Sequence, residues 1–141
     1  MWRLEHSVRT RADAETAWRF WTNVATWSVD PGVERVAVDP AFVSGARGVT
    51  VTADGGTVTW FLPQVGPGRT AHIEIPAPGV VLHARWCFEP ADPGGAVLTQ
   101  EMWLSGEGAD TPEAVAAGEV LAAGVPAGMQ RLADAIDALE A

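Results

Sequence analysis

Apolar and polar residues alternate along several stretches in the middle of this sequence. In "VVLHARWCFE" and "AVLTQEMWLS" the even-numbered positions are mostly apolar and include Val80, Leu82, Ala84, Trp86, Phe88, Leu98, Met102 and Leu104. Residues 57–62 and 70–75 alternate in the same way. A period of two predicts β-strands that bury one face and expose the other. His83 and Arg85 then belong to the polar face.

Short segments rich in glycine and proline separate these stretches. They are "ADGG" at 53–56, "QVGPG" at 64–68, "PAPG" at 76–79 and "DPGG" at 92–95. Such segments favour tight turns, and their spacing is that of strands joined by hairpins. The pattern therefore predicts an antiparallel meander, preceded by one strand at about residues 2–10.

Two helical patterns flank the predicted sheet. The first begins near Asp13 as N-cap and places Ala17 or Trp18 on one stripe with Trp21. The second carries apolar residues spaced four, three, four and three at Val125, Met129, Leu132, Ile136 and Leu139. We expect this C-terminal helix to cover the apolar face of the sheet.

The C-terminal helical pattern contains a proline between two glycines. Because Pro126 cannot donate to Ala122, and Gly124 and Gly128 flank it, we expect a break or kink at residues 123–125. Two interpretations stay open. The break is either a loop between two helices or a hinge that lets residues 112–122 move as a lid.

Several segments resemble one protein family. They are "SVRTRADAETAWRFWTNVATWSVDPGVERVAVD", the Phe and Gly of "AFVSGARG", "VTWFL", "ADPGGAVLTQEMWLSG" and "RLADAIDALE". Together they resemble the polyketide cyclase/dehydrase-like branch of the START-like (SRPBCC) superfamily. The resemblance implies a single domain over residues 1–141 with the α+β helix-grip fold. In that fold two short helices follow the first strand, and a curved seven-stranded antiparallel sheet wraps a long C-terminal helix over a mainly hydrophobic cavity.

The composition fits a globular protein and excludes some partners. The 141 residues are 48% hydrophobic with a single cysteine, and no apolar run reaches the roughly 18 residues of a membrane span. The N-terminus lacks the apolar region of a signal peptide, so we expect a cytoplasmic protein without membrane insertion. The net charge of −9 argues against nucleic acid and anionic lipid as partners. The oligomeric state is not predicted.

The expected ligand-binding residues lie on the apolar face and near its mouth. They are Trp27, Trp60, Trp86, Gln100 and Met102. The resemblance implies that Trp27 lies near the cavity mouth, whereas strand parity places the other four. Gln100 is the clearest polar residue among them, and we expect it either to orient a ligand or to satisfy a buried strand. Each tryptophan either lines a cavity or packs the core.

Acid–base, metal and cofactor chemistry have few candidates. His6 shares parity with Leu4 and Val8, so it is the only inward titratable residue and the only candidate catalytic group. His72 and His83 fall on the polar face, and no histidine pairs with a carboxylate at metal-ligand spacing in the sequence. We therefore expect no metal and no cofactor. Cys87 is interpreted as a packing residue.

Three functions stay open at this point. The first is binding of a small hydrophobic or aromatic molecule in the internal cavity. The second is a polyketide cyclase/dehydrase-like enzyme that uses His6 and water in the same cavity. The third is a protein-interaction module of the chaperone-activator kind, with the acidic C-terminal third as its contact surface. The scarcity of inward acids and bases favours the first.

Overall fold

The computed structural model describes residues 2–139 and contains seven strands and four helical segments in this range. The strands are β1 (Arg3–Thr10), β2 (Val33–Asp39), β3 (Arg47–Thr52), β4 (Thr57–Gly66), β5 (Thr70–Ala77), β6 (Val80–Pro90) and β7 (Ala96–Ser105). The helices are α1 (Ala14–Thr22), the 3-10 helix η1 (Val24–Val29), α2 (Pro112–Ala123) and α3 (Val125–Ala138). None of these helices is long and apolar enough to cross a membrane.

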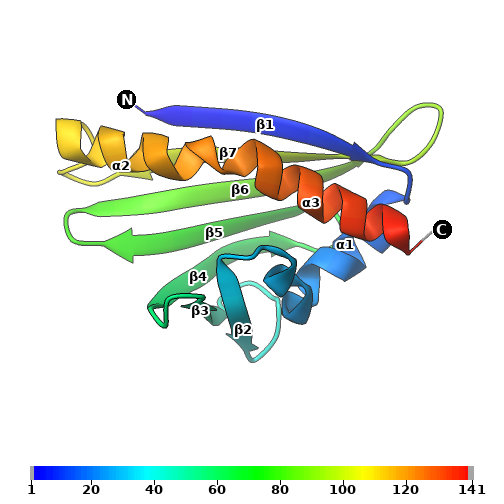
Figure 1. Cartoon of the computed structure of the whole chain (residues 1–141), viewed down its shortest axis with the longest axis horizontal. Coiled ribbons are helices and arrows are strands. Elements are labelled where there is room, and N and C mark those ends of the chain that lie inside the picture. The colour runs from blue at the N-terminus through cyan, green and yellow to red at the C-terminus, as the bar shows by residue number, and fades with distance from the viewer. Residues whose placement is uncertain (1, 140–141) are drawn as a thin grey trace.

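The strands form one antiparallel sheet in the order β1-β7-β6-β5-β4-β3-β2. Strands β2 to β7 follow one another as a meander, and β1 joins its open edge beside β7. Figure 1 shows the C-terminal helix lying across the β1, β7 and β6 side, with α1 near the C-terminal part of α3 and β2 at the opposite edge of the sheet. This is the helix-grip arrangement, so the predicted fold class is confirmed.

One face of the sheet is buried under the helices, as the alternation predicts. On this inner face Leu82, Ala84, Trp86, Leu98, Gln100 and Met102 are all buried. Arg85 is exposed and His83 half-buried on the opposite, outer face. Side-chain parity was therefore sufficient to sort the two faces.

The helix after β1 begins where its capping residue predicts. The Asp13 carboxylate accepts a hydrogen bond from the backbone N–H of Thr16 at 2.8 Å, which satisfies a free donor of the first turn. Ala17, Trp18 and Trp21 are buried against the sheet. The edge-to-face contact between Trp18 and Phe88, with ring centroids 5.3 Å apart, joins α1 to β6.

The C-terminal helix is interrupted at a single residue. Gly124 separates α2 from α3, and its φ of −88° and ψ of −12° stay within the right-handed helical region. The predicted break is confirmed, and it needs no loop. Pro126 lies in the first turn of α3, where a backbone N–H has no partner within the helix, so proline is tolerated there. Motion about this point stays a prediction.

Candidate functional site

The site begins with three side chains that form one row across the inner face. In the antiparallel register His6 of β1 lies opposite Gln100 of β7, and Gln100 lies opposite Trp86 of β6. Directly paired residues project from the same face, with Cβ atoms about 4.5–5.5 Å apart. An imidazole, a carboxamide and an indole are therefore neighbours on the buried side of the sheet.

Solvent reaches the Gln100 amide even though its residue is buried. Its side chain forms no hydrogen bond to any residue within 2–139, although only 9% of Gln100 is exposed. In the same part of the chain, every side-chain nitrogen or oxygen that is closed off from solvent has a partner. The small exposed area of Gln100 therefore includes its amide, which faces open space.

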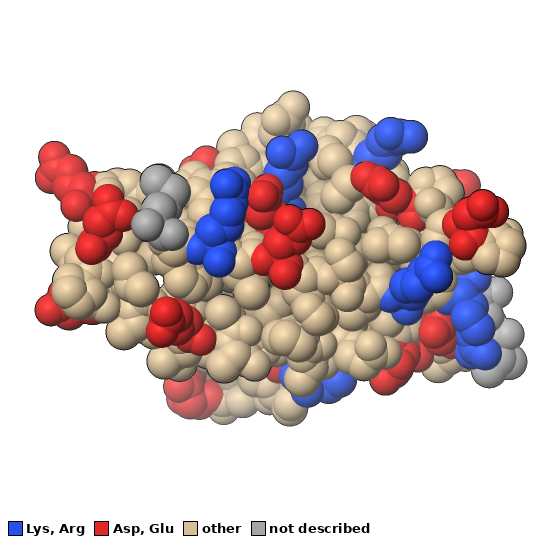
Figure 2. All heavy atoms as spheres, turned by 90° about the horizontal axis from the view of Figure 1, so that it is seen from above, with Lys and Arg blue, Asp and Glu red and all other residues tan. Residues whose placement is uncertain are grey.

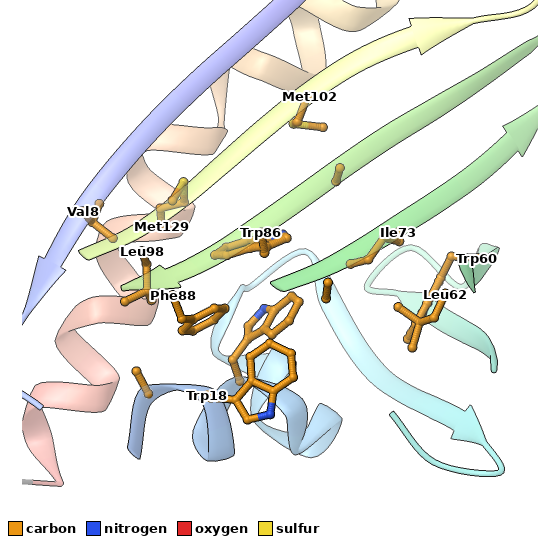
Figure 3. Packing of buried hydrophobic residues seen from close by; sticks show 14 of the residues in the cluster. Val8, Trp18, Trp60, Leu62, Ile73, Trp86, Phe88, Leu98, Met102 and Met129 are labelled. Carbon is orange, nitrogen blue, oxygen red and sulfur yellow. The ribbon is translucent and has the colours of Figure 1, made fainter. Parts of the chain in front are cut away.

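The exposed fraction of the buried side chains differs along the inner face. At the α1 end Leu98 and Phe88 are 0% and 1% exposed, whereas Met102 and Leu82 at the α2 end retain 5% and 7%. Figure 3 shows Met129 of α3 with Val8 and Leu98, and Met102 farther along β7. The inner face is thus most tightly filled at the α1 end, whereas Gln100 and Trp86 of the row retain 9% and 8%.

Helix α2 packs closely against the start of the chain at a glycine, Gly118. A Cβ atom built on Gly118 would lie 2.9 Å from the indole of Trp2, so the absence of a side chain allows the helix to approach β1 closely. Elsewhere on α2, Val120 and Leu121 are exposed.

Trp27 and Trp60 form a stacked wall beyond Trp86. Their ring centroids are 5.1 Å apart at 24°, and Trp27 also stacks on Trp21 at 5.7 Å. The Trp27 indole N–H donates to the carbonyl of Trp21 at 2.6 Å, which holds its ring in place. Because Trp21 lies 4.9 Å from Trp86, the four indoles form a continuous aromatic series.

Trp60 is the most deeply buried of the five candidate ligand-binding residues. It is 2% exposed, and its indole N–H donates to the Thr50 hydroxyl at 3.0 Å. Its ring lies over Gly48, the residue directly opposite on β3, where a Cβ atom would be 2.1 Å from the ring. The ring thus packs against the sheet itself, and contact between Trp60 and a ligand stays a prediction.

Two hollows open to the surface beside the sheet. One, of about 450 Å³, is lined by Arg3, Trp103, Leu104, Ser105, Gly106, Ala109 and Asp110. The other, of about 160 Å³, lies on the outer face among Glu5, Arg85, Cys87, Thr99 and Glu101. The first hollow thus includes one inner-face residue, Leu104, together with outer-face residues such as Trp103.

Cys87 lies on the outer face beside the second hollow. Partial burial and the neighbouring Glu89 carboxylate, which accepts a hydrogen bond from the thiol at 3.2 Å, raise the pKa of Cys87. A raised pKa keeps sulfur as the poorly nucleophilic thiol. This surrounding opposes a nucleophilic role, in agreement with the interpretation of Cys87 from the sequence.

The outer face holds a cluster that the sequence analysis missed. His72 and Glu74 of β5 and His83 of β6 bring three potential ligand atoms within 4.8 Å of one another. The expectation that no histidine meets a carboxylate at metal-ligand spacing is therefore wrong. That expectation considered spacing along the chain, whereas Glu74 and His83 are direct partners across two strands. The signal in the sequence was the pair His72 and Glu74, two positions apart on one strand face.

His83 of this cluster contacts several neighbouring side chains. Its ring stacks on Trp103 with centroids 4.9 Å apart and planes at 2°. Partial burial and the neighbouring His72 lower the pKa of His83, and the Glu74 charge opposes that shift. The Arg3 guanidinium lies over the Trp103 ring, 5.8 Å from its centroid.

Comparison with known proteins agrees with the fold. The family model described as polyketide cyclase / dehydrase and lipid transport matches residues 1–139. The chain belongs to this family. Its description covers both catalysis and lipid transport, so membership supports a ligand-binding or cyclase role. None of the curated proteins compared with the chain matches it.

Solved structures share the fold at low sequence identity. The di-domain ARO/CYC protein BexL from the BE-7585A biosynthetic pathway aligns with 95% of this chain and 46% of its own, at 19% identity and a TM-score of 0.76. This chain thus spans about half the length of BexL. Protein XoxI from Bacillus cereus aligns over 100% and 99% of the two chains, at 14% identity and a TM-score of 0.77. Norcoclaurine synthase from Thalictrum flavum, solved with dopamine and hydroxybenzaldehyde, aligns over 98% and 85%, at 16% identity and 0.71.

Proposed function

We propose that this protein binds a small hydrophobic or aromatic molecule between the inner face of the sheet and the C-terminal helix. The observation that carries the proposal is the Gln100 amide, which keeps some accessible surface on a mainly apolar face. A pocket that is mainly apolar, with a few polar groups that orient the ligand, is the usual arrangement for small-molecule recognition.

The five candidate ligand-binding residues have complementary roles in this proposal. Trp86 and Met102 supply apolar contact, and the Gln100 carboxamide both donates to and accepts from a ligand hydroxyl or carbonyl. Trp27 and Trp60 form the aromatic wall beyond them. The family's description and the aromatic compounds named with norcoclaurine synthase support a ligand of this class.

The test compares two ligands that differ by one hydroxyl group. Displacement of the neutral dye Nile red gives the affinities of naphthalene and 2-naphthol for the wild type and for Gln100→Leu. A net hydrogen bond contributes about 0.5–1.5 kcal/mol, so we expect the wild type to prefer 2-naphthol about 2- to 10-fold and the variant to lose that preference. Trp86→Ala should lower the affinity for both naphthalene and 2-naphthol.

The matched control is Glu101→Gln, which changes the neighbouring side chain on the outer face. It should keep the wild-type preference. An unchanged preference in Gln100→Leu, or dye binding that does not saturate, would overturn the proposal. Native mass spectrometry of freshly purified protein adds a direct search for a bound small molecule.

A cyclase is the second candidate, and the position of His6 favours it. His6 is half-buried and directly opposite Gln100, so an acid–base group lies beside the amide that would orient a carbonyl. Aldol cyclisation requires a base that removes a proton next to a carbonyl, within about 3 Å of that proton. The neutral imidazole of His6 would accept this proton and return it to the alkoxide that forms.

The cyclase candidate has its own measurement. Wild-type protein and His6→Gln are incubated with a linear poly-β-ketone, and the cyclised product is followed by chromatography. Loss of a general base typically costs about 10²- to 10⁴-fold in rate, so the variant should fall to near the uncatalysed rate while still binding Nile red. Equal rates for both proteins would leave binding as the function.

A further inference from the structure

On the outer face, two histidines and a glutamate converge from adjacent strands. His72 and Glu74 lie two positions apart on β5, so they project from the same face, and His83 lies directly opposite Glu74 on β6. Their nearest ligand atoms all lie within 4.8 Å of one another, and all three side chains are half-buried. From this cluster we propose a binding site for Zn²⁺ that is separate from the inner-face site.

The spacing of the two imidazoles suits one cation. Nε2 of His72 and Nδ1 of His83 are 2.8 Å apart and share one hydrogen. Two nitrogens bound to the same tetrahedral Zn²⁺ at about 2.0–2.1 Å are about 3.3 Å apart. Replacing the shared proton by the cation therefore requires the two nitrogens to separate by about half an ångström and the rings to turn so that both lone pairs point at the cation. The Glu74 carboxylate supplies the third ligand and a balancing negative charge.

The second ring nitrogen of His83 is already hydrogen-bonded. Its Nε2 is 2.7 Å from the Ser105 hydroxyl on β7, while its ring stacks on Trp103. When Nε2 donates its proton to Ser105, the lone pair of Nδ1 points to the cluster. A ligating histidine whose other nitrogen is hydrogen-bonded in this way has its tautomer and ring orientation fixed.

The ligand set identifies the kind of metal. Imidazole nitrogen favours zinc and its transition-metal neighbours over calcium and magnesium, which prefer oxygen. Two histidines and one glutamate leave the fourth tetrahedral position for water, as in zinc sites with an open position. The strands of a sheet hold these ligands more rigidly than a loop would, which limits the reorganisation that binding requires.

Isothermal titration of tag-free protein with ZnCl₂, after removal of metals with a chelator, tests the site. We expect one saturable site in the wild type. Loss of a supporting hydrogen bond alone lowers metal affinity about 10- to 100-fold. Removal of a ligand, in His72→Ala or His83→Ala, should lower the affinity by more than about 100-fold, and Ser105→Ala by about tenfold.

The remaining histidine provides the control. His6→Ala removes an imidazole from the inner face and should bind Zn²⁺ like the wild type. Circular dichroism establishes that each variant is folded, and Glu74→Gln, which preserves side-chain size, serves as an additional ligand variant. Absence of a saturable site in the wild type, or equal affinities for His83→Ala and His6→Ala, would overturn the proposal. Neither outcome bears on ligand binding at the inner face.

Discussion

At the scale of single residues, Trp60 and Gly48 act as a pair. The indole lies across a glycine on the neighbouring strand, which leaves no room for a Cβ atom, and its N–H is held by Thr50. Trp60 is 2% exposed, compared with 9% for Trp18 of α1. The tryptophan that strand parity offered as a cavity residue is therefore at least as well packed as the helical one.

We expect Trp60→Ala to be strongly destabilising. Removal of a packed large side chain typically lowers the free energy of unfolding by about 3–5 kcal/mol, because lost burial and a new cavity add. Gly48→Ala should also destabilise, since its new methyl group would overlap the Trp60 ring. In the Trp60→Ala background, however, Gly48→Ala should be nearly neutral.

Chemical denaturation of the two single variants and the double variant forms a complete double-mutant cycle. Trp103→Ala, on the outer face, serves as a comparison for loss of a less buried indole. Strict additivity of the two changes would contradict the packing described here.

At the scale of elements, the Asp137 carboxylate of α3 is hydrogen-bonded to the end of β1. Asp137 of α3 accepts hydrogen bonds from the Thr10 hydroxyl at 2.5 Å and from the backbone N–H of Arg11 at 2.8 Å. Partial burial raises the pKa of Asp137, but these hydrogen bonds and the Arg11 charge outweigh that effect and lower it. The ionised carboxylate thus joins two elements that are far apart in sequence.

This contact predicts a dependence of stability on pH. Because the pKa of Asp137 is lower in the folded than in the unfolded state, its stabilisation is present above the ordinary carboxyl pKa of about 4. It is lost as the pH falls from there through the folded-state value. Asp137→Asn should therefore be less stable than the wild type at pH 7, and the difference should shrink as the pH approaches 3. Urea denaturation across this range measures it, and a constant difference would refute the expectation.

At the scale of the whole molecule, charge is unevenly distributed along the chain. Arginines and acids are equal in number in residues 1–88, whereas Arg131 is the only basic side chain, lysine or arginine, among the many acids of residues 89–141. On the face in Figure 2, arginine and acidic side chains are interspersed. A net charge of −9 opposes association with polyanions such as nucleic acid.

The sequence by itself determined the elements and their faces. The alternation in β6 and β7 placed Trp86, Gln100 and Met102 inward, and Asp13 marked the start of α1. These features depend on local periodicity and on hydrogen bonds between residues a few positions apart. Such signals are complete within a short segment, which is why they can be recognised without the fold.

Only the tertiary structure decided which of these side chains meet and how closely they pack. The pairing of β5 with β6 brings Glu74 to His83, and the packing of distant segments leaves Gln100 9% exposed and Trp60 only 2%. Strand register and helix placement depend on contacts between segments distant in the chain. No short pattern contains that information, because the free energy that selects a register is shared among many residues of the core.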